Sequence, residues 1–193
     1  MKSIVVFCGS SEGSEQEFTS DAYALGTFLA KQQIDVVYGG AKIGIMGQVA
    51  QGALDAQGTV IGVIPEFLKL REVFHESLTE LIVTRNMHER KLKMHELSDG
   101  IIMLPGGYGT LEEFFEMLTW GQLGLHQYPI GILNTNGFYD ELLTMLKKMV
   151  EKGFVKQENY DMILADRTIA GLIAKMEKYQ PLPLPKWIKK EQL

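Results

Sequence analysis

Short runs of apolar residues alternate with amphipathic segments along most of the chain. The first run, over residues 3–8, is apolar at nearly every position, which is typical of a central strand covered by helices on both faces. Similar runs predict strands over 34–38, 59–64, 81–83, 101–104 and 130–133. Between the strands, apolar residues at helical spacing predict helices over 15–33, 45–56, 87–97, 110–123, 139–152 and 168–179.

Strands that alternate with helices predict an α/β fold with a Rossmann-like, doubly wound parallel sheet. No repeat, low-complexity run or linker interrupts the pattern, so we predict a single domain over residues 1–180. Residues 66–79 show no clear period and are predicted to be irregular. The proline-rich residues 181–193 are predicted to form an extended tail on the surface or against a partner subunit.

Composition narrows the range of partners. A net charge of −5 and a hydrophobic content of 46% give no reason to expect nucleic acid or a membrane surface. No segment approaches the roughly 18 apolar residues of a membrane span, and the apolar run after Lys2 is too short for a secretion signal. The single cysteine, Cys8, forms no internal disulfide and is predicted to be an inert strand residue. These features predict a cytoplasmic protein.

Three glycine-bearing turns follow predicted strands, at residues 9–11, 39–47 and 105–110. In a parallel sheet all three lie at the same edge, where ligands bind. Each can present backbone N–H groups near a helix start, where the helix dipole adds partial positive charge suited to a phosphate. The candidate phosphate-binding residues in these turns are Ser10, Gly40, Gly106, Gly107, Gly109 and Thr110. For the first turn, a plain strand-to-helix connection is an equally good interpretation.

Two familiar nucleotide motifs are missing from these turns. The first turn lacks the G-x-G-x-x-G pattern, and no Walker lysine sequence occurs in the chain. A nicotinamide or flavin enzyme and an ATPase are therefore disfavoured. His88 and His95 have no nearby cysteine or aspartate at ligand spacing, so we predict no metal site.

Charged residues on two predicted helices are candidates for chemistry. Glu113 shares a helix face with Thr110 and Met117, and is predicted to point into the pocket of the third glycine turn. Glu112 and Glu116 are equally well explained as acids favoured by the dipole near the helix start. Arg90 and Lys91 lie in the apolar stripe of their helix, where an inward charge needs an opposite charge. The alternative is a solvated helix end with its long side chains reaching water.

The motifs resemble those of the LOG (Lonely Guy) family of cytokinin riboside 5′-monophosphate phosphoribohydrolases. Residues 105–113 are similar to the signature PGGxGTxxE, and residues 87–91 to the signature MHxRK. Residues 38–47 are similar to YGGxxxGLMG, with Ile45 where leucine is usual. The similarity runs from Ile4 to about Phe154 and is closest to short bacterial members, some of which carry the label possible lysine decarboxylase.

The resemblance implies a Rossmann-like fold, a homodimer and no metal or organic cofactor. It implies that Arg90 and Glu113 are the catalytic pair. The substrate-binding positions that it implies are Glu72, Arg90, Lys91, Gly107, Tyr108, Gly109, Thr110, Leu111, Glu112, Glu113 and Thr119. Of these, Glu72 and Thr119 lie outside the strong motifs.

We therefore predict hydrolysis of the N-glycosidic bond of a nucleoside 5′-monophosphate to a free base and ribose 5-phosphate. Glu113 would stabilise positive charge on the ribose and orient or deprotonate the attacking water. Arg90 would hold the substrate or assist the departing base. The preference between isoprenoid adenine and plain adenine stays open, because it depends on the far wall of the pocket, for which Met46 and residues near 119 are candidates. Two alternatives are a pyridoxal-phosphate decarboxylase that uses Lys91 and a non-catalytic nucleotide sensor or carrier on the same fold.

Overall fold

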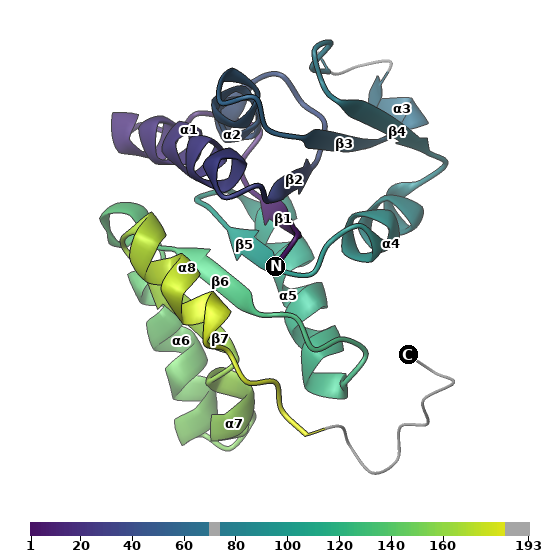
Figure 1. Cartoon of the computed structure of the whole chain (residues 1–193). Helices are drawn as coiled ribbons and strands as arrows, with labels where there is room; N and C mark the ends of the chain where they lie inside the picture. The colour runs from purple at the N-terminus through teal and green to yellow at the C-terminus, as the bar shows by residue number, and fades with distance from the viewer. Residues whose placement is uncertain (70–73, 184–193) are drawn as a thin grey trace.

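A computed structural model describes residues 1–69 and 74–183, and helices cover both faces of its central parallel sheet (Figure 1). The first half of the chain contains β1 (Ser3–Phe7), α1 (Gln16–Lys31), β2 (Asp35–Tyr38), α2 (Gly44–Asp55), β3 (Val60–Pro65), α3 (Glu66–Lys69), β4 (Glu80–Thr84) and α4 (Met87–Glu96). The second half contains β5 (Ile101–Met103), α5 (Tyr108–Leu123), β6 (Ile130–Leu133), the 3-10 turn η1 (Thr135–Gly137), α6 (Asp140–Glu151), α7 (Gln157–Tyr160), β7 (Ile163–Asp166) and α8 (Ile169–Glu177).

The strand order creates a crevice at the centre of the sheet. The strands lie in the order β4-β3-β2-β1-β5-β6-β7, and every pair is parallel. The chain therefore builds outward from β1 to β4, then returns to the middle and builds outward again from β5. The loops after β1 and β5 diverge to opposite sides at this reversal, which is where sheets of this kind bind ligands. The predicted Rossmann-like, single-domain fold is confirmed.

Alternating side chains of each central strand fill two separate hydrophobic cores. Ile4 and Val6 of β1 face one core, together with α1, α2 and α8. Val5 and Phe7 face the other, together with α4, α5 and α6. The strand is apolar at consecutive positions because both of its faces are covered. Figure 1 shows these two helical layers on either side of the sheet.

Several boundaries differ from those that the sequence predicts. Residues 66–79 begin with the short helix α3 rather than irregular chain. Pro65 is the last residue of β3, whereas the predicted strand ends one residue earlier. The helix α7 and the strand β7 were not predicted. At the sheet edge, every residue of β7 is only half-buried, so its sequence lacks the continuous apolar run of a central strand. A proline such as Pro65 is tolerated at the end of a strand because no backbone N–H is needed there for the sheet.

The C-terminal segment packs against the domain as far as it is described. Gln127 Nε2 donates a hydrogen bond to the Leu182 carbonyl at 3.4 Å, and Leu182 contacts the second hydrophobic core. The predicted division between a domain and a tail at residue 180 stays a prediction, because residues 184–193 lie outside the described residues. Within the described ranges, no helix is long and apolar enough to cross a membrane.

Candidate active site

The three glycine-bearing turns meet at the central crevice of the sheet. Gly9 N donates a hydrogen bond to the Pro105 carbonyl at 3.0 Å, which joins the turns after β1 and β5. Met46 N donates to the Gly9 carbonyl at 3.2 Å, which joins the turn after β2 to the same place. The predicted convergence of the three turns at one sheet edge is confirmed.

The helix starts at this edge differ in how their backbone amides are used. At the start of α2, the amides of Ile45 and Met46 donate to the Ser11 and Gly9 carbonyls. At the start of α4, the Asn86 side chain accepts a hydrogen bond from Glu89 N at 2.9 Å. In α5, by contrast, no side chain of the described residues caps the helix. Because the first amides of a helix lack partners within it, the start of α5 is the one of these three that is open to an anion.

The glycines at the start of α5 serve two different purposes. A Cβ at Gly106 would overlap the Thr110 side chain and lie 2.8 Å from Gly9 N, so packing within the protein requires glycine there. A Cβ at Gly107 or Gly109 would meet nothing within 4 Å. Packing therefore does not account for these two glycines, and the space beside them is available to a ligand.

A cavity of about 390 Å³ adjoins these amides, of a size suited to a small molecule. Its wall contains polar and charged residues predicted for the site together with apolar residues from the strand ends and α4. The predicted residues in the wall are Ser10, Arg90, Gly107, Tyr108, Gly109, Thr110, Glu112 and Glu113. Tyr108 is 94% exposed at the start of α5.

Arg90 enters the cavity from α4 and is held by the backbone of the sheet. Its Nε donates to the Val63 carbonyl at 3.0 Å, and its Nη2 donates to the Gly39 carbonyl at 3.1 Å. The residue is only 6% exposed. The alternative of a solvated arginine at a helix end is therefore wrong. The third nitrogen, Nη1, lies 3.8 Å from Met87 Sδ and 4.0 Å from Glu113 Oε1.

Glu113 faces Arg90 across the cavity on the buried side of α5. Thr110, Glu113 and Met117 are all buried on one face of the helix, as predicted. Glu113 Oε1 lies 4.0 Å from Arg90 Nη1, which is too long for a hydrogen bond. Burial raises the pKa of the Glu113 carboxyl to about 7, although Arg90 opposes the shift. Near neutral pH this carboxyl can therefore both accept and release a proton.

Lys91 lies beside Arg90 on α4 but is absent from the cavity wall. Its Nζ forms ion pairs with Glu112 Oε1 at 2.5 Å and Glu116 Oε2 at 2.9 Å. Burial acts to lower the pKa of the ammonium, but the contacts with Glu112 and Glu116 outweigh it, and the pKa is raised. A lysine that forms a Schiff base must lose its proton, so these contacts disfavour the decarboxylase alternative.

The structure places several other predicted residues away from the cavity wall. Gly40 turns toward the β3–β4 side of the sheet, where its carbonyl accepts a hydrogen bond from His75 N. Thr119 is exposed on α5 and donates to the Phe115 carbonyl. Gly106 and Leu111 lie next to lining residues without lining this cavity. Glu72 lies outside the described residues.

Three methionines form the apolar part of the wall together with Val6. Met46 is the residue predicted for the far wall of the pocket, whereas Met87 and Met94 are not among the predicted site residues. Met46 comes from the start of α2, while Met87 and Met94 flank Arg90 on α4. The sequence contains the signal, because Met87, Arg90 and Met94 share one helix face. That spacing is also typical of core methionines. Methionine is flexible and polarisable, so this wall suits a flat aromatic base.

Cys8 also lines the cavity, at the end of β1. Burial and the neighbouring Glu113 raise the pKa of its thiol far above the ordinary range, with Arg90 opposing the shift. The thiol therefore stays protonated, in agreement with the predicted inert cysteine. Among the residues at 1–69 and 74–183, no group of three or more His, Cys, Asp or Glu could hold a metal ion.

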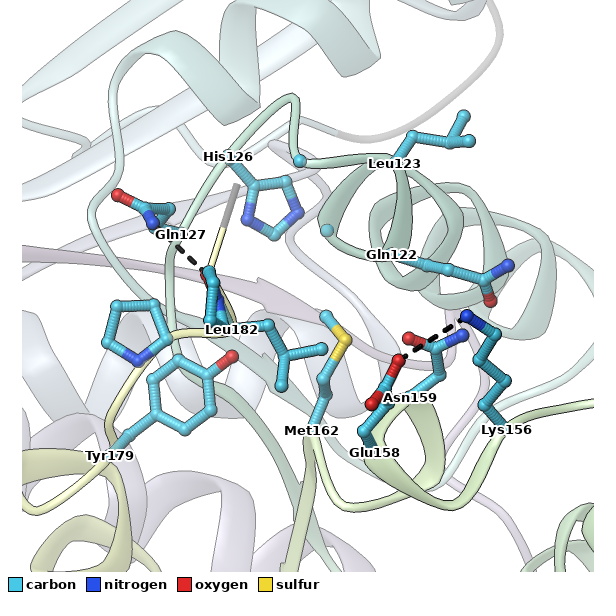
Figure 2. A pocket seen from close by; sticks show the side chains of 14 residues that line it. Gln122, Leu123, His126, Gln127, Lys156, Glu158, Asn159, Met162, Tyr179 and Leu182 are labelled. Atoms are coloured by element: carbon cyan, nitrogen blue, oxygen red, sulfur yellow. Dashed lines mark hydrogen bonds and ion pairs between the residues drawn. The ribbon is translucent and has the colours of Figure 1, made fainter. Parts of the chain in front are cut away.

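A second cavity, of about 430 Å³, lies at the far end of α5 (Figure 2). Figure 2 shows His126 beside it, with Lys156 and Glu158 paired at its rim. His126 Nδ1 accepts a hydrogen bond from Tyr128 N, and Nε2 lies 2.7 Å from the Met117 carbonyl. Burial lowers the pKa of this imidazole to about 4. With both nitrogens engaged, His126 is a structural residue, and the chemistry is better placed at the Arg90–Glu113 cavity.

Comparison with known proteins identifies relatives along nearly the whole chain. A family model described as "Possible lysine decarboxylase" matches residues 46–176. The chain is 45% identical over 178 residues, covering 92% of its length and 83% of the relative's, to "Cytokinin riboside 5′-monophosphate phosphoribohydrolase LOG3" of Arabidopsis thaliana. It is also 45% identical, over 91% of its length and 79% of the relative's, to "Probable cytokinin riboside 5′-monophosphate phosphoribohydrolase LOGL1" of Oryza sativa subsp. japonica.

Solved structures share the fold at lower identity. A molybdenum cofactor binding protein from Rippkaea orientalis superposes with a TM-score of 0.70 at 24% identity, covering 92% of this chain and 96% of that one. A Moco carrier protein from Chlamydomonas reinhardtii superposes with a TM-score of 0.69 at 22% identity, covering 91% and 95%. These likenesses concern the fold alone.

Proposed function

The chain belongs to the LOG family of cytokinin riboside 5′-monophosphate phosphoribohydrolases, and we propose that it hydrolyses the N-glycosidic bond of adenosine 5′-monophosphates, N6-modified ones included. The products are a free base, either a cytokinin or adenine, and ribose 5-phosphate. The observation that supports this most directly is the position of the Glu113 carboxyl. Glu113 is buried, opposes Arg90 at 4.0 Å and lines the same cavity as the open amides of α5.

The phosphate is proposed to bind at the start of α5. Gly107, Tyr108, Gly109 and Thr110 line the cavity there, and the helix dipole favours an anion at the backbone amides of a helix start. Glu113 lies one turn further along the same helix face. A ribose that extends from the bound phosphate therefore brings its anomeric carbon to the carboxyl, and phosphate binding energy positions the bond to be broken.

Glycosidic cleavage develops positive charge on the ribose as the base leaves. The ionised Glu113 carboxyl stabilises that charge and removes a proton from the water that attacks the anomeric carbon. The base departs toward the methionine wall with the electron pair of the glycosidic bond and takes up one proton, from the protonated Glu113 or from solvent, which balances the proton removed from water. Arg90 holds the substrate against Glu113 or assists the leaving base. Other proposed contacts, from Ser10 and Glu112, lie in the same cavity wall.

A non-catalytic nucleotide carrier is the second candidate, because the fold also occurs in proteins named as cofactor carriers. A buried acid whose pKa lies near 7 opposite a fixed guanidinium favours an enzyme instead. Incubation of the protein with AMP or isopentenyladenosine monophosphate, followed by chromatography, separates the two. Release of free base supports the hydrolase, and bound but intact nucleotide supports the carrier. The matching nucleosides, which lack the phosphate, serve as controls.

Activity is expected to rise with pH through about 7 and to level off above it. The Glu113 carboxyl is the proposed base, so only its ionised form is active, and burial raises its pKa to about 7. Because kcat/KM reports on the free enzyme, its acid limb is the quantity to measure between pH 5 and 9. Activity that instead falls with rising pH through 7 would assign Glu113 the role of acid toward the leaving base.

Gly109→Ala is expected to weaken nucleotide binding without weakening the fold. A Cβ there meets no protein atom within 4 Å, and alanine suits a helix better than glycine, so unfolding temperature is unchanged or higher. Because Gly109 lines the cavity, the added methyl group narrows the proposed phosphate site, and KM for AMP rises about tenfold or more. Gly106→Ala is the matched variant, because its Cβ overlaps Thr110 and lowers stability. Unchanged KM in Gly109→Ala would place the phosphate elsewhere.

We also propose that the protein acts as a homodimer in the cytoplasm. The helices α4 and α5 expose large apolar side chains, Leu92 at 47% and Leu123 at 37%, which suit a subunit contact. The one cysteine of the chain is buried and protonated, as suits a reducing compartment. Light scattering at micromolar protein concentration measures the assembly directly.

A further inference from the structure

The shortest ion pairs between α4 and α5 are those of Lys91, which does not line the cavity. Lys91 Nζ is held between two carboxylates one helical turn apart, Glu112 at 2.5 Å and Glu116 at 2.9 Å. The Lys91 side chain is only 6% exposed. A cation so far removed from water is stable only with opposite charges close by, and these two carboxylates supply them.

This contact runs beside the Arg90–Glu113 pair. Lys91 follows Arg90 on α4, and Glu113 lies between Glu112 and Glu116 in the sequence of α5. The two helices lie on the same face of the sheet (Figure 1). The Arg90 guanidinium is fixed by β3 and the turn after β2 rather than by α5, so its distance from Glu113 depends on how α5 is held against α4.

We propose that Lys91 is a positioning residue: by binding Glu112 and Glu116 it ties α5 to α4 and keeps the Glu113 carboxyl in register with the Arg90 guanidinium. This inference rests on the proposed function, since it assigns Lys91 a part in the same hydrolytic site. It differs from direct contact with the substrate, which the resemblance to the family implies for Lys91. A lysine that contacts the phosphate governs KM, whereas a positioning residue governs kcat.

The same contact also shields Glu113 from its charged neighbours. The groups that face the carboxyl are Arg90 and Lys91 from α4, Cys8 from the end of β1, and Glu112 and Glu116 from its own helix. Beyond the effect of burial, Arg90 and Lys91 lower the pKa of Glu113, while Glu112 and Glu116 raise it. Removal of Lys91 takes away one lowering charge and leaves two raising charges without a partner. Removal of the Glu116 charge takes away one raising charge and therefore lowers the pKa of Glu113.

The test compares Lys91→Met and Glu116→Gln with wild type. We expect Lys91→Met to lower kcat about tenfold with KM within about threefold of wild type, and to move the acid limb of kcat/KM upward by about half a pH unit or more. We expect Glu116→Gln, whose side chain is partly exposed, to move the acid limb downward. Lys91→Arg keeps the charge and is expected to restore the wild-type limb. Lys93→Met, which breaks an exposed pair with Glu96 on the same helix, is the control and leaves both parameters unchanged.

Opposite shifts of the acid limb in Lys91→Met and Glu116→Gln support the proposal. A loss of packing alone would not shift the two variants in opposite directions. A large rise in KM for Lys91→Met with an unmoved acid limb overturns it in favour of phosphate contact. Titration of the Glu113 carboxyl carbon by NMR reads the same shifts without turnover. If wild type releases no base from any nucleotide, the proposed function fails, while equal Glu113 titration in wild type and Lys91→Met is the result that refutes the positioning role.

Discussion

Glu113→Gln is expected to lower kcat for AMP by about 10³-fold while the nucleotide still binds. The amide keeps the size of the side chain but neither takes a proton from water nor balances positive charge on the ribose. The proposed phosphate site, at the start of α5, is unchanged by the substitution. Calorimetry or fluorescence with AMP measures binding, and chromatography of released adenine measures turnover. Turnover at the wild-type rate would exclude Glu113 as the catalytic carboxyl.

Glu113→Gln is also expected to change the pH dependence of stability. The pKa of Glu113 is raised in the folded protein to about 7 from an ordinary value of 4.5. Its protonated form is therefore favoured by folding, and that contribution to stability is present below pH 4.5 and lost as pH rises through 7. At pH 8 the wild type holds a costly buried carboxylate, so glutamine is expected to raise the free energy of unfolding by about 1–3 kcal/mol. Denaturant unfolding at pH 8 and pH 4.5 checks the sign, because the gain disappears at the lower pH.

Arg90→Ala is expected to damage both binding and turnover, with kcat/KM lower by about 10³-fold or more. The guanidinium is the cation nearest to the proposed reaction, and it also lowers the pKa of Glu113. Without it, Glu113 stays protonated to higher pH, so the remaining activity rises only at more alkaline pH than in wild type. Full rate profiles from pH 6 to 9 separate this shift from a simple loss of binding.

Arg90→Lys is the matched variant for that prediction. It keeps the positive charge, but an ammonium does not reproduce the planar fork that reaches both the Val63 and Gly39 carbonyls. We expect an intermediate loss of activity and an acid limb close to wild type. If Arg90→Ala and Arg90→Lys both behave as wild type, the arginine serves the fold rather than the reaction.

The sequence predicts most of the sheet because the central strands are buried on both faces. The runs at 3–8 and 130–133 contain almost only apolar residues, and both form strands where predicted. β7 escapes prediction because an edge strand that is half-buried shows neither a continuous run nor a strict alternation. α7 is a single turn between α6 and β7, too short for a helical period to be visible.

The candidate site is predictable only in part, for a related reason. Spacing along one helix places Thr110, Glu113 and Met117 on one face, and the structure agrees. Spacing does not reveal which residues of different helices meet. The carbonyls that hold Arg90 come from β3 and the turn after β2, and the carboxylates that pair with Lys91 come from α5. Such partners depend on the way the chain returns to the centre of the sheet after β4.

Carbonyls of β3 and of the turn after β2 hold the Arg90 guanidinium, so its position does not depend on the neighbouring side chains of α4. Substitutions on the outer side of α4, at His88, Leu92 or Lys93, alter a surface that the guanidinium does not touch. That surface can therefore change in sequence while the position of the guanidinium opposite Glu113 is kept.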